Sequence, residues 1–391
     1  MKSISKLAIE GGTPVRASML PYGRQSIDAA DEQAVLAALR SDFITTGPLV
    51  NRFETAFAER VGARFAVAVS SGTAALHAAM FAAGIGPDME VIVPAMTFAA
   101  SANCARYQGG NVVFVDVRDD NLNVDIDAIT NALTAKTRAV VAVDFAGHPA
   151  VTEQIRLLAK ARNLSLIEDA SHALGATLDG KRVGSLADMT TFSFHPVKHI
   201  TTGEGGMITT DDPELAARLR RFRNHGITTT HSDREKAASW YYEQIDLGYN
   251  YRLTDIQCAL GLSQLARLDG WLERRRAIAA RYNEAFARLS LVRRPTVLPG
   301  ADSAWHLYLV RVRNMDRGKV FRALRAENIG VNVHYIPVPW HPYYQDLGYT
   351  KGQWPVSEQA YAEAISLPMF ATMTDRDVND VIDAVEKVLE R

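Results

Sequence analysis

The chain has 391 residues, 47% hydrophobic and 22% charged, which is an ordinary globular composition with room for one large and one smaller domain. Its formal net charge is −1, and no block of lysine or arginine stands out. This balance argues against binding of nucleic acid or of an anionic membrane surface, so we expect small molecules as partners.

The first segment, MKSISKLAIEGGTP, lacks the continuous apolar core of a signal peptide, and no later stretch is long and apolar enough to span a bilayer. From about Phe65 onward, short β-branched runs alternate with longer helical periodicities. Strands are predicted in RFAVAV, MEVIVPA, NVVFVDV, RAVVAVD and LSLIED. The alternation predicts an α/β fold with a mostly parallel sheet, in which ligands gather at the carboxyl ends of the strands.

The pattern in the second half of the sequence indicates that the chain passes into another domain. After the apolar runs MTTFSFH and GGMITTDD come the helix PELAARLRRFRN and a long helical pattern from about Thr254 to Leu289. Beyond a Pro- and Gly-containing loop lie the strand HLYLVRV and the helices RGKVFRALRAEN and DRDVNDVIDAVEKVLER. We expect a large domain over residues 25–265 and a smaller C-terminal α+β domain over residues 266–391 that includes residues 1–24.

Cysteine and histidine usage limits the chemistry. Only Cys104 and Cys258 occur, both within apolar helical stretches, as expected for buried free thiols in a reducing compartment, and a cytoplasmic location is predicted. The histidines are scattered and lack the paired spacing of a zinc site, so no metal is expected.

The stretch SSGTAALH places Gly72 and Thr73 between a strand and a helix. Free N–H groups and the positive end of the helix dipole can hold a phosphate there, and glycine allows close approach of the backbone. The alternative is a helix that is merely capped, with Thr73 satisfying local backbone donors.

In LSLIEDASHALGA, Asp169 directly follows an apolar strand, where an ionised group needs a partner because desolvation is costly. A pyridinium nitrogen is one such cation, and His172 on the following turn could then reach the phenolic oxygen of the same ring. A helix cap or a structural ion pair is the alternative for Asp169.

In SFHPVKHITTGEGG, Lys198 follows an apolar strand and precedes a Gly-rich loop. A buried lysine has a lowered pKa, can form a Schiff base with an aldehyde, and can move a proton as base and acid. A P-loop is rejected because its lysine would follow the glycines, and no dinucleotide fingerprint occurs. A solvated surface lysine is the alternative.

Five stretches in fixed order resemble the pyridoxal-phosphate sugar aminotransferases of the DegT/DnrJ/EryC1/StrS family: SSGTAALH, PAMTFAASAN, EDASHALGA, SFHPVKHITTGEGG and LGYNYRLTDIQCALGLSQL. The resemblance covers nearly the whole chain and implies the type I fold of these transferases. Further stretches, among them SDFITTGP and VHYIPV, resemble the members that form a UDP-4-amino-4,6-dideoxy sugar in pseudaminic acid synthesis.

The resemblance implies a role for each matching residue. Lys198 would hold pyridoxal 5′-phosphate covalently, Asp169 would pair with its ring nitrogen, and His172 would lie near the phenolic oxygen. The remaining implied cofactor contacts are Gly72, Thr73 and Ser193 at the phosphate, Phe98 on the ring face, and Asn250 of the partner subunit. A homodimer with two shared sites follows.

For the nucleotide sugar, the resemblance points to Tyr22, Asp42, Phe43, Ile44, Thr45, Val333, His334 and Tyr335. The tyrosines could merely pack, and Thr45 could be a turn residue. The implied reaction moves the amino group of L-glutamate to the C4 ketone of a UDP-4-keto-6-deoxy-N-acetylhexosamine. Glutamine as donor, a 3-keto, dTDP-linked or cyclitol acceptor, and a non-catalytic regulator with this fold stay open.

Overall fold

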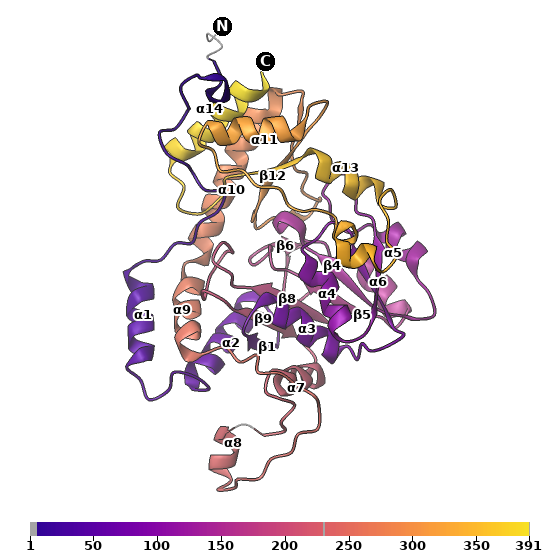
Figure 1. Cartoon of the computed structure of the whole chain (residues 1–391). Coiled ribbons are helices and arrows are strands. Elements are labelled where there is room, and N and C mark those ends of the chain that lie inside the picture. Colours follow the sequence, from indigo (N-terminus) through magenta and orange to yellow (C-terminus); the bar gives the residue numbers. More distant parts are fainter. Residues whose placement is uncertain (1–5, 230, 391) are drawn as a thin grey trace.

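A computed structural model describes residues 6–229 and 231–390 of the chain (Figure 1). A seven-stranded sheet in the order β1-β9-β8-β5-β4-β2-β3 forms its centre, and every strand is parallel to the others except β9. The strands are β1 (Phe65–Val69), β2 (Glu90–Pro94), β3 (Asn111–Val115), β4 (Thr137–Val143), β5 (Ser165–Asp169), β8 (Met189–Ser193) and β9 (Gly206–Thr210). The predicted mostly parallel α/β architecture is confirmed.

Both faces of this sheet are buried, because successive side chains of a strand point to opposite sides. In β1, Ala66 and Ala68 join the core around Phe53 and Phe57, whereas Val67 and Val69 join the core on the other face. The helices in this part of the chain are α1 (Ala29–Leu39), α2 (Pro48–Val61), α3 (Gly72–Ala82), α4 (Ala99–Tyr107), α5 (Ile126–Ala132), α6 (Glu153–Ala161) and α7 (Pro213–Phe222).

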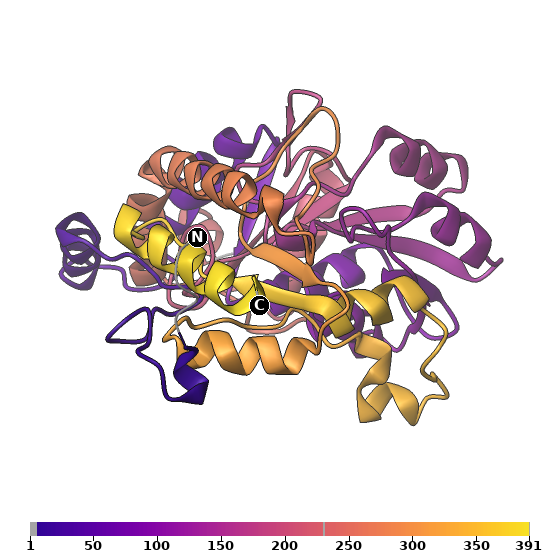
Figure 2. The same ribbon diagram turned by 90° about the horizontal axis from the view of Figure 1, so that it is seen from above.

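A second core lies above the sheet, around the antiparallel strands β10 (Val292–Arg293), β12 (Tyr308–Val312) and β13 (Ala364–Leu367). The N-terminal segment lies against the C-terminal elements (Figure 2). It belongs to this core, since Leu7 and Leu20 are buried in it and Leu20 pairs with Ile329. The helices of the C-terminal part are α10 (Leu268–Ala285), α11 (Arg317–Ala326), α12 (Pro342–Gln345), α13 (Pro355–Glu363) and α14 (Asp375–Leu389). The division into domains at residue 265 stays a prediction.

The long helical pattern expected from Thr254 to Leu289 forms two helices, α9 (Asp255–Ala266) and α10, with Arg267 between them. The Arg267 guanidinium binds the carboxylates of Asp28 and Asp31, which ties this junction to the start of α1. The remaining short elements are β6 (Thr177–Leu178), β7 (Lys181–Arg182), β11 (Ala301–Asp302), α8 (His231–Lys236) and the 3₁₀ turns Ala8–Glu10, Phe145–Gly147, Phe286–Arg288 and Val338–Trp340.

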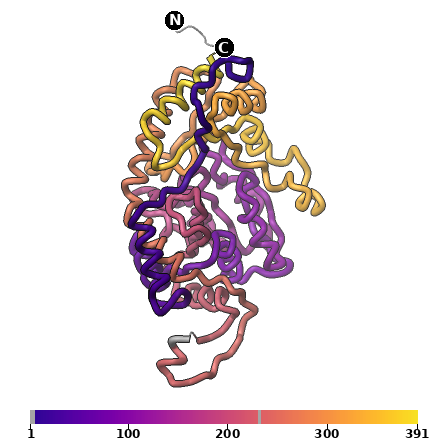
Figure 3. The backbone as a smooth tube through the Cα atoms, turned by 60° about the vertical axis from the view of Figure 1, so that its left-hand side comes forward, coloured from indigo at the N-terminus to yellow at the C-terminus, as the bar shows by residue number. Residues whose placement is uncertain are grey.

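Three further observations concern the described part of the chain. Cys104 and Cys258 are buried and unpaired, as predicted. Within residues 6–229 and 231–390, no helix combines the length and the apolar character that a membrane span requires. Helix α8 stands apart from the body, on an arm between α7 and α9 (Figure 3).

Candidate functional site

A cavity of about 390 Å³ opens at the carboxyl ends of β4, β5 and β8, where an α/β sheet is expected to bind its ligand. The N-terminus of α3, the residues just before α4 and the segment after β12 of the second core close it. Of the predicted site residues, the cavity is lined by Tyr22, Gly72, Thr73, Phe98, Asp169, His172, Ser193, Lys198, His334 and Tyr335. Residues far apart in the sequence thus meet at one place.

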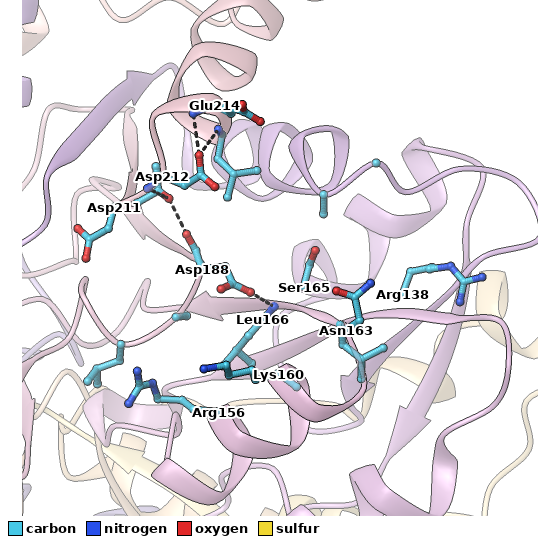
Figure 4. A pocket seen from close by; sticks show the side chains of 18 of the residues that line it. Arg138, Arg156, Lys160, Asn163, Ser165, Leu166, Asp188, Asp211, Asp212 and Glu214 are labelled. Carbon is cyan, nitrogen blue, oxygen red and sulfur yellow. Dashed lines mark hydrogen bonds between the residues drawn. The ribbon is translucent and has the colours of Figure 1, made fainter.

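A larger hollow of about 1220 Å³ lies at the opposite, amino-terminal edge of the sheet (Figure 4). Two of its acidic side chains bind backbone groups: Asp188 accepts from the N–H of Leu166 at 2.8 Å, and Asp212 accepts from two N–H groups at the start of α7. These carboxylates cap elements of the fold, so the smaller cavity is the candidate site.

Asp169 ends β5 and is 5% exposed. Its Oδ2 accepts a hydrogen bond from the Ser101 hydroxyl at 2.6 Å, and its Oδ1 accepts from the Ser171 hydroxyl at 2.6 Å and from the Ser171 N–H at 3.2 Å. These three donors point at both oxygens, an arrangement that matches an acceptor-only carboxylate. A fixed negative charge therefore borders the cavity.

Lys198 lies in the loop after β8 and is half-buried, with its side chain at the cavity wall. Burial lowers the pKa of its amine to about 8, although the nearby Asp169 carboxylate acts in the opposite direction. Close to neutral pH the amine can therefore exist in both protonation states. The alternative reading of a solvated surface lysine does not describe this position.

Neutral histidines surround the amine. Burial lowers the pKa of His172 well below its usual value, and Lys198 adds to the effect. The Nε2 atom of His172 lies 3.2 Å from the Tyr335 hydroxyl, and its buried Nδ1 has no hydrogen-bond partner among the described residues. The His306 ring packs against that of His172 at a tilt of 32° with ring centroids 4.3 Å apart, and burial likewise lowers the pKa of His306. The cluster keeps further positive charge away from Lys198.

The start of α3 lines the same cavity as Asp169. Ser71 caps the helix through its side chain, which accepts from the Ala74 N–H at 3.0 Å, so capping does not require Thr73. A Cβ on Gly72 would lie 2.8 Å from the Cβ of Ser193, so only glycine allows this approach. The helix N-terminus, Thr73 and Ser193 together offer donors to an anion. Phe98, 58% exposed, stands at the cavity with its ring 5.9 Å from that of Tyr335.

Other predicted residues lie outside the cavity wall of a single chain. The stretch Asp42 to Thr45 is exposed between α1 and α2 and pairs with the start of α9, where the Asp255 N–H donates to the Ile44 carbonyl. Asn250 is exposed and pairs with Asn224. Val333 is half-buried beside His334. The structure does not bring these residues together with Lys198.

Several lining residues were missed by the sequence analysis: Thr97, Ser171, His195, Val197, Glu204 and His306. Most lie within one to six positions of a predicted residue, inside the quoted motifs, so their neighbourhood was a usable signal. His306 had no signal, because it comes from the strand region of the second core and reaches the cavity only through the fold.

Comparisons with known proteins give consistent matches. The model of the DegT/DnrJ/EryC1/StrS aminotransferase family matches residues 25–386. The chain is 37% identical over 380 residues to the UDP-4-amino-4,6-dideoxy-N-acetyl-β-L-altrosamine transaminase of Campylobacter jejuni, covering 95% of this chain and 98% of the relative. Among solved structures it is similar to PseC of Helicobacter pylori, an aminotransferase of pseudaminic acid biosynthesis, with 31% identity, a TM-score of 0.89 and coverage of 95% and 100%. A putative sugar aminotransferase of Streptococcus pneumoniae in its PMP form gives 32% identity, a TM-score of 0.89 and coverage of 95% and 99%.

Proposed function

Because the chain belongs to the DegT/DnrJ/EryC1/StrS aminotransferase family, we propose that it moves the amino group of L-glutamate to the C4 ketone of a UDP-linked 4-keto-6-deoxy-N-acetylhexosamine. The products are 2-oxoglutarate and a UDP-4-amino-4,6-dideoxy sugar. The chain is a sugar aminotransferase with the type I transferase fold, and its cofactor is pyridoxal 5′-phosphate. One observation carries the proposal, namely that Lys198 and Asp169 line the same cavity at the carboxyl ends of the strands.

The residues of the cavity fit this cofactor. Three features that this cofactor needs lie around the same cavity. They are an amine of lowered pKa, a carboxylate that can meet a ring nitrogen, and a helix N-terminus that can hold a phosphate. Because Gly72 lies so close to Ser193, a side chain at this position would fill space that the glycine leaves open. The buried Nδ1 of His172 has no hydrogen-bond partner among the described residues. We assign Gly72, Thr73 and Ser193 to the phosphate, Asp169 to the ring nitrogen, His172 to the phenolic oxygen and Phe98 to the ring face.

When bound there, pyridoxal phosphate would supply a carrier for the amino group and a ring that can delocalise negative charge from the reacting carbon. Lys198 binds the cofactor and, when free, takes a proton from the donor carbon and returns one to the sugar carbon. Its lowered pKa suits both tasks, because a base and acid is most effective when its pKa lies near the working pH. Tyr335 and His172 orient each other through their 3.2 Å contact at the cavity wall.

The sugar side of the cavity is assigned to Tyr22, His334 and Tyr335. Tyr22 comes from the N-terminal segment and packs its ring 5.6 Å from that of His334. His334 is held in turn by a 2.8 Å contact between its Nδ1 and the Ser366 hydroxyl on β13. The side chains that would meet the sugar thus rest on the second core, which fixes their positions relative to Lys198.

We predict that the purified holoenzyme aminates a UDP-4-keto-6-deoxy-N-acetylhexosamine with glutamate as donor. The measurement is a panel of UDP- and dTDP-linked keto sugars offered with glutamate or glutamine, with the amino sugars identified by mass and NMR. A 3-amino product, a dTDP preference or amination of a cyclitol ketone would replace the proposed acceptor. No amination of any ketone, combined with intact cofactor binding, would favour a non-catalytic regulator.

We also propose a homodimer with shared sites, in which Asn250 of the partner subunit completes the phosphate site. Exposed aromatic and aliphatic side chains support it, because they gather on the segment that precedes Asn250. This segment belongs to the arm between α7 and α9 (Figures 1 and 3). Trp240 is 88% exposed there, and a patch of this kind marks an interaction surface. The patch contains Trp240, Tyr241, Tyr242, Ile245, Leu247 and Tyr249.

A hybrid dimer tests the shared site. Asn250→Ala should weaken cofactor binding by about 10- to 100-fold, because a hydrogen bond to a charged phosphate is lost. In a hybrid of one Asn250→Ala subunit and one Lys198→Ala subunit, isolated with two affinity tags, the site that keeps Lys198 receives Asn250 from its partner. That site should regain wild-type cofactor affinity. Affinity that stays weakened in the hybrid would show that Asn250 serves its own subunit, and unchanged affinity in the Asn250→Ala homodimer would show that it serves no site.

We place the protein in the cytoplasm. Two buried cysteines that form no disulfide support a reducing compartment.

A further inference from the structure

A chain of hydroxyl groups leads through the core to Asp169. Ser101, in the first turn of α4, is completely buried, and its hydroxyl donates to Asp169 Oδ2 at 2.6 Å. The Thr97 hydroxyl lies 2.8 Å from the Ser101 hydroxyl and is also buried. Ser171 binds the other carboxylate oxygen. Neither Ser101 nor Thr97 was assigned a role by the motifs.

The direction of this chain follows from counting protons. A hydroxyl group has one proton to donate, and Ser101 uses its proton toward Asp169, because an ionised carboxylate can only accept. Thr97 must therefore donate to the Ser101 oxygen. A hydroxyl that accepts one hydrogen bond becomes a better donor for the next, so Thr97 strengthens the bond from Ser101 to Asp169.

The geometry of the acceptor shows why this bond matters. Asp169 is 5% exposed, so water cannot replace a missing donor at low cost. The Ser171 pair holds Oδ1 from the turn that follows β5, and Ser101 holds Oδ2 from α4, on the other side of the carboxylate. Donors on two separate elements fix the plane of the carboxylate.

We propose that Ser101, supported by Thr97, is a positioning residue that keeps the Asp169 carboxylate oriented toward the cofactor ring nitrogen. The proposal rests on the proposed function, since it uses the assignment of Asp169. Ser101 does not line the cavity and acts only through Asp169.

The test compares two buried serines of matched chemistry. Ser357 is also completely buried and donates to a carboxylate, Asp116 Oδ1, at 2.6 Å, but Asp116 caps α13 outside the cavity. Ser101→Ala and Ser357→Ala are each loaded with pyridoxal phosphate labelled with ¹⁵N in the ring. The ring ¹⁵N chemical shift and kcat are then measured.

We expect Ser101→Ala to move the ring nitrogen signal toward that of an unprotonated pyridine and to lower kcat about 10- to 100-fold, whereas Ser357→Ala leaves both at wild-type values. Thr97→Val should move the signal less, and Thr97→Ser should restore it. An unchanged signal in Ser101→Ala overturns the proposal; if that variant does not fold, an unchanged signal in Thr97→Val overturns it.

The ¹⁵N signal needs only the bound cofactor, so it separates two failures. A wrong sugar acceptor changes the activity assay and leaves the signal differences between variants in place. A wrong role for Ser101 removes those differences while the wild-type enzyme still aminates its sugar.

Discussion

Replacement of Lys198 by alanine will reduce amino-group transfer by about 100- to 10,000-fold, the range over which a positioned acid and base accelerates proton transfer. The fold should persist, because Lys198 lies in a loop and forms no side-chain hydrogen bond or ion pair that holds two described elements together. Loss of a half-buried amine also removes an unfavourable desolvation. The measurement is kcat with glutamate and the keto sugar, together with the melting temperature.

Lys160→Ala is the control for this variant, because Lys160 borders the hollow at the opposite edge of the sheet. It should keep wild-type turnover. Treatment with borohydride should fix the cofactor to a peptide containing residue 198 in the wild type and in Lys160→Ala, and not in Lys198→Ala. A Lys198→Ala enzyme with more than about a tenth of wild-type turnover would contradict the assigned role.

The central sheet could be predicted from the sequence because its strands are buried on both faces and read as unbroken apolar runs, as in VIVPA or AVVAV. The prediction of one long helical pattern after Thr254 did not show that the segment forms two helices. At the break, Arg267 binds the acidic side chains of Asp28 and Asp31, which precede it by more than 200 residues, so a local pattern cannot show this contact. Helices as short as α12 contain too few residues for their sequence to show a helical periodicity.

The residues of the candidate site likewise fall into those that the sequence could place and those that it could not. The topology of the sheet places three of these residues at one edge, because each lies at or after the carboxyl end of a strand: Gly72, Asp169 and Lys198. His306 and Ser101 could not be predicted, since one arrives from the second core and the other acts from within α4. The stretch Asp42 to Thr45 and Asn250 match motifs but lie away from the cavity of one chain, so their assignment depends on a second subunit.

Asp169→Asn is expected to have the second-largest effect, about a 100- to 1,000-fold loss of kcat, comparable to the loss of a preorganised electrostatic contact in other enzymes. Asparagine has nearly the same shape and can still accept hydrogen bonds from Ser101 or Ser171, so the fold and the cavity should remain. What disappears is the negative charge, and with it the reason for the cofactor ring nitrogen to stay protonated. The measurement is kcat together with the visible spectrum of the loaded enzyme.

Glu168→Gln is the matched control, because Glu168 precedes Asp169 on β5 and therefore points to the opposite face of the sheet. Burial raises the pKa of Glu168 to about 7, and its Oε2 accepts from the Thr190 hydroxyl at 2.8 Å, a bond that glutamine can keep. Turnover should stay near that of the wild type.

A cofactor analogue methylated at the ring nitrogen separates charge from shape at Asp169. Its ring is permanently positive and needs no carboxylate to hold a proton, so it should recover much of the activity that Asp169→Asn loses, while giving the wild-type enzyme no gain. Recovery would show that Asp169 acts through its charge on the ring nitrogen. Equal turnover of Asp169→Asn and Glu168→Gln with the natural cofactor would instead show that the buried carboxylate, despite its three hydrogen bonds, supports only the fold.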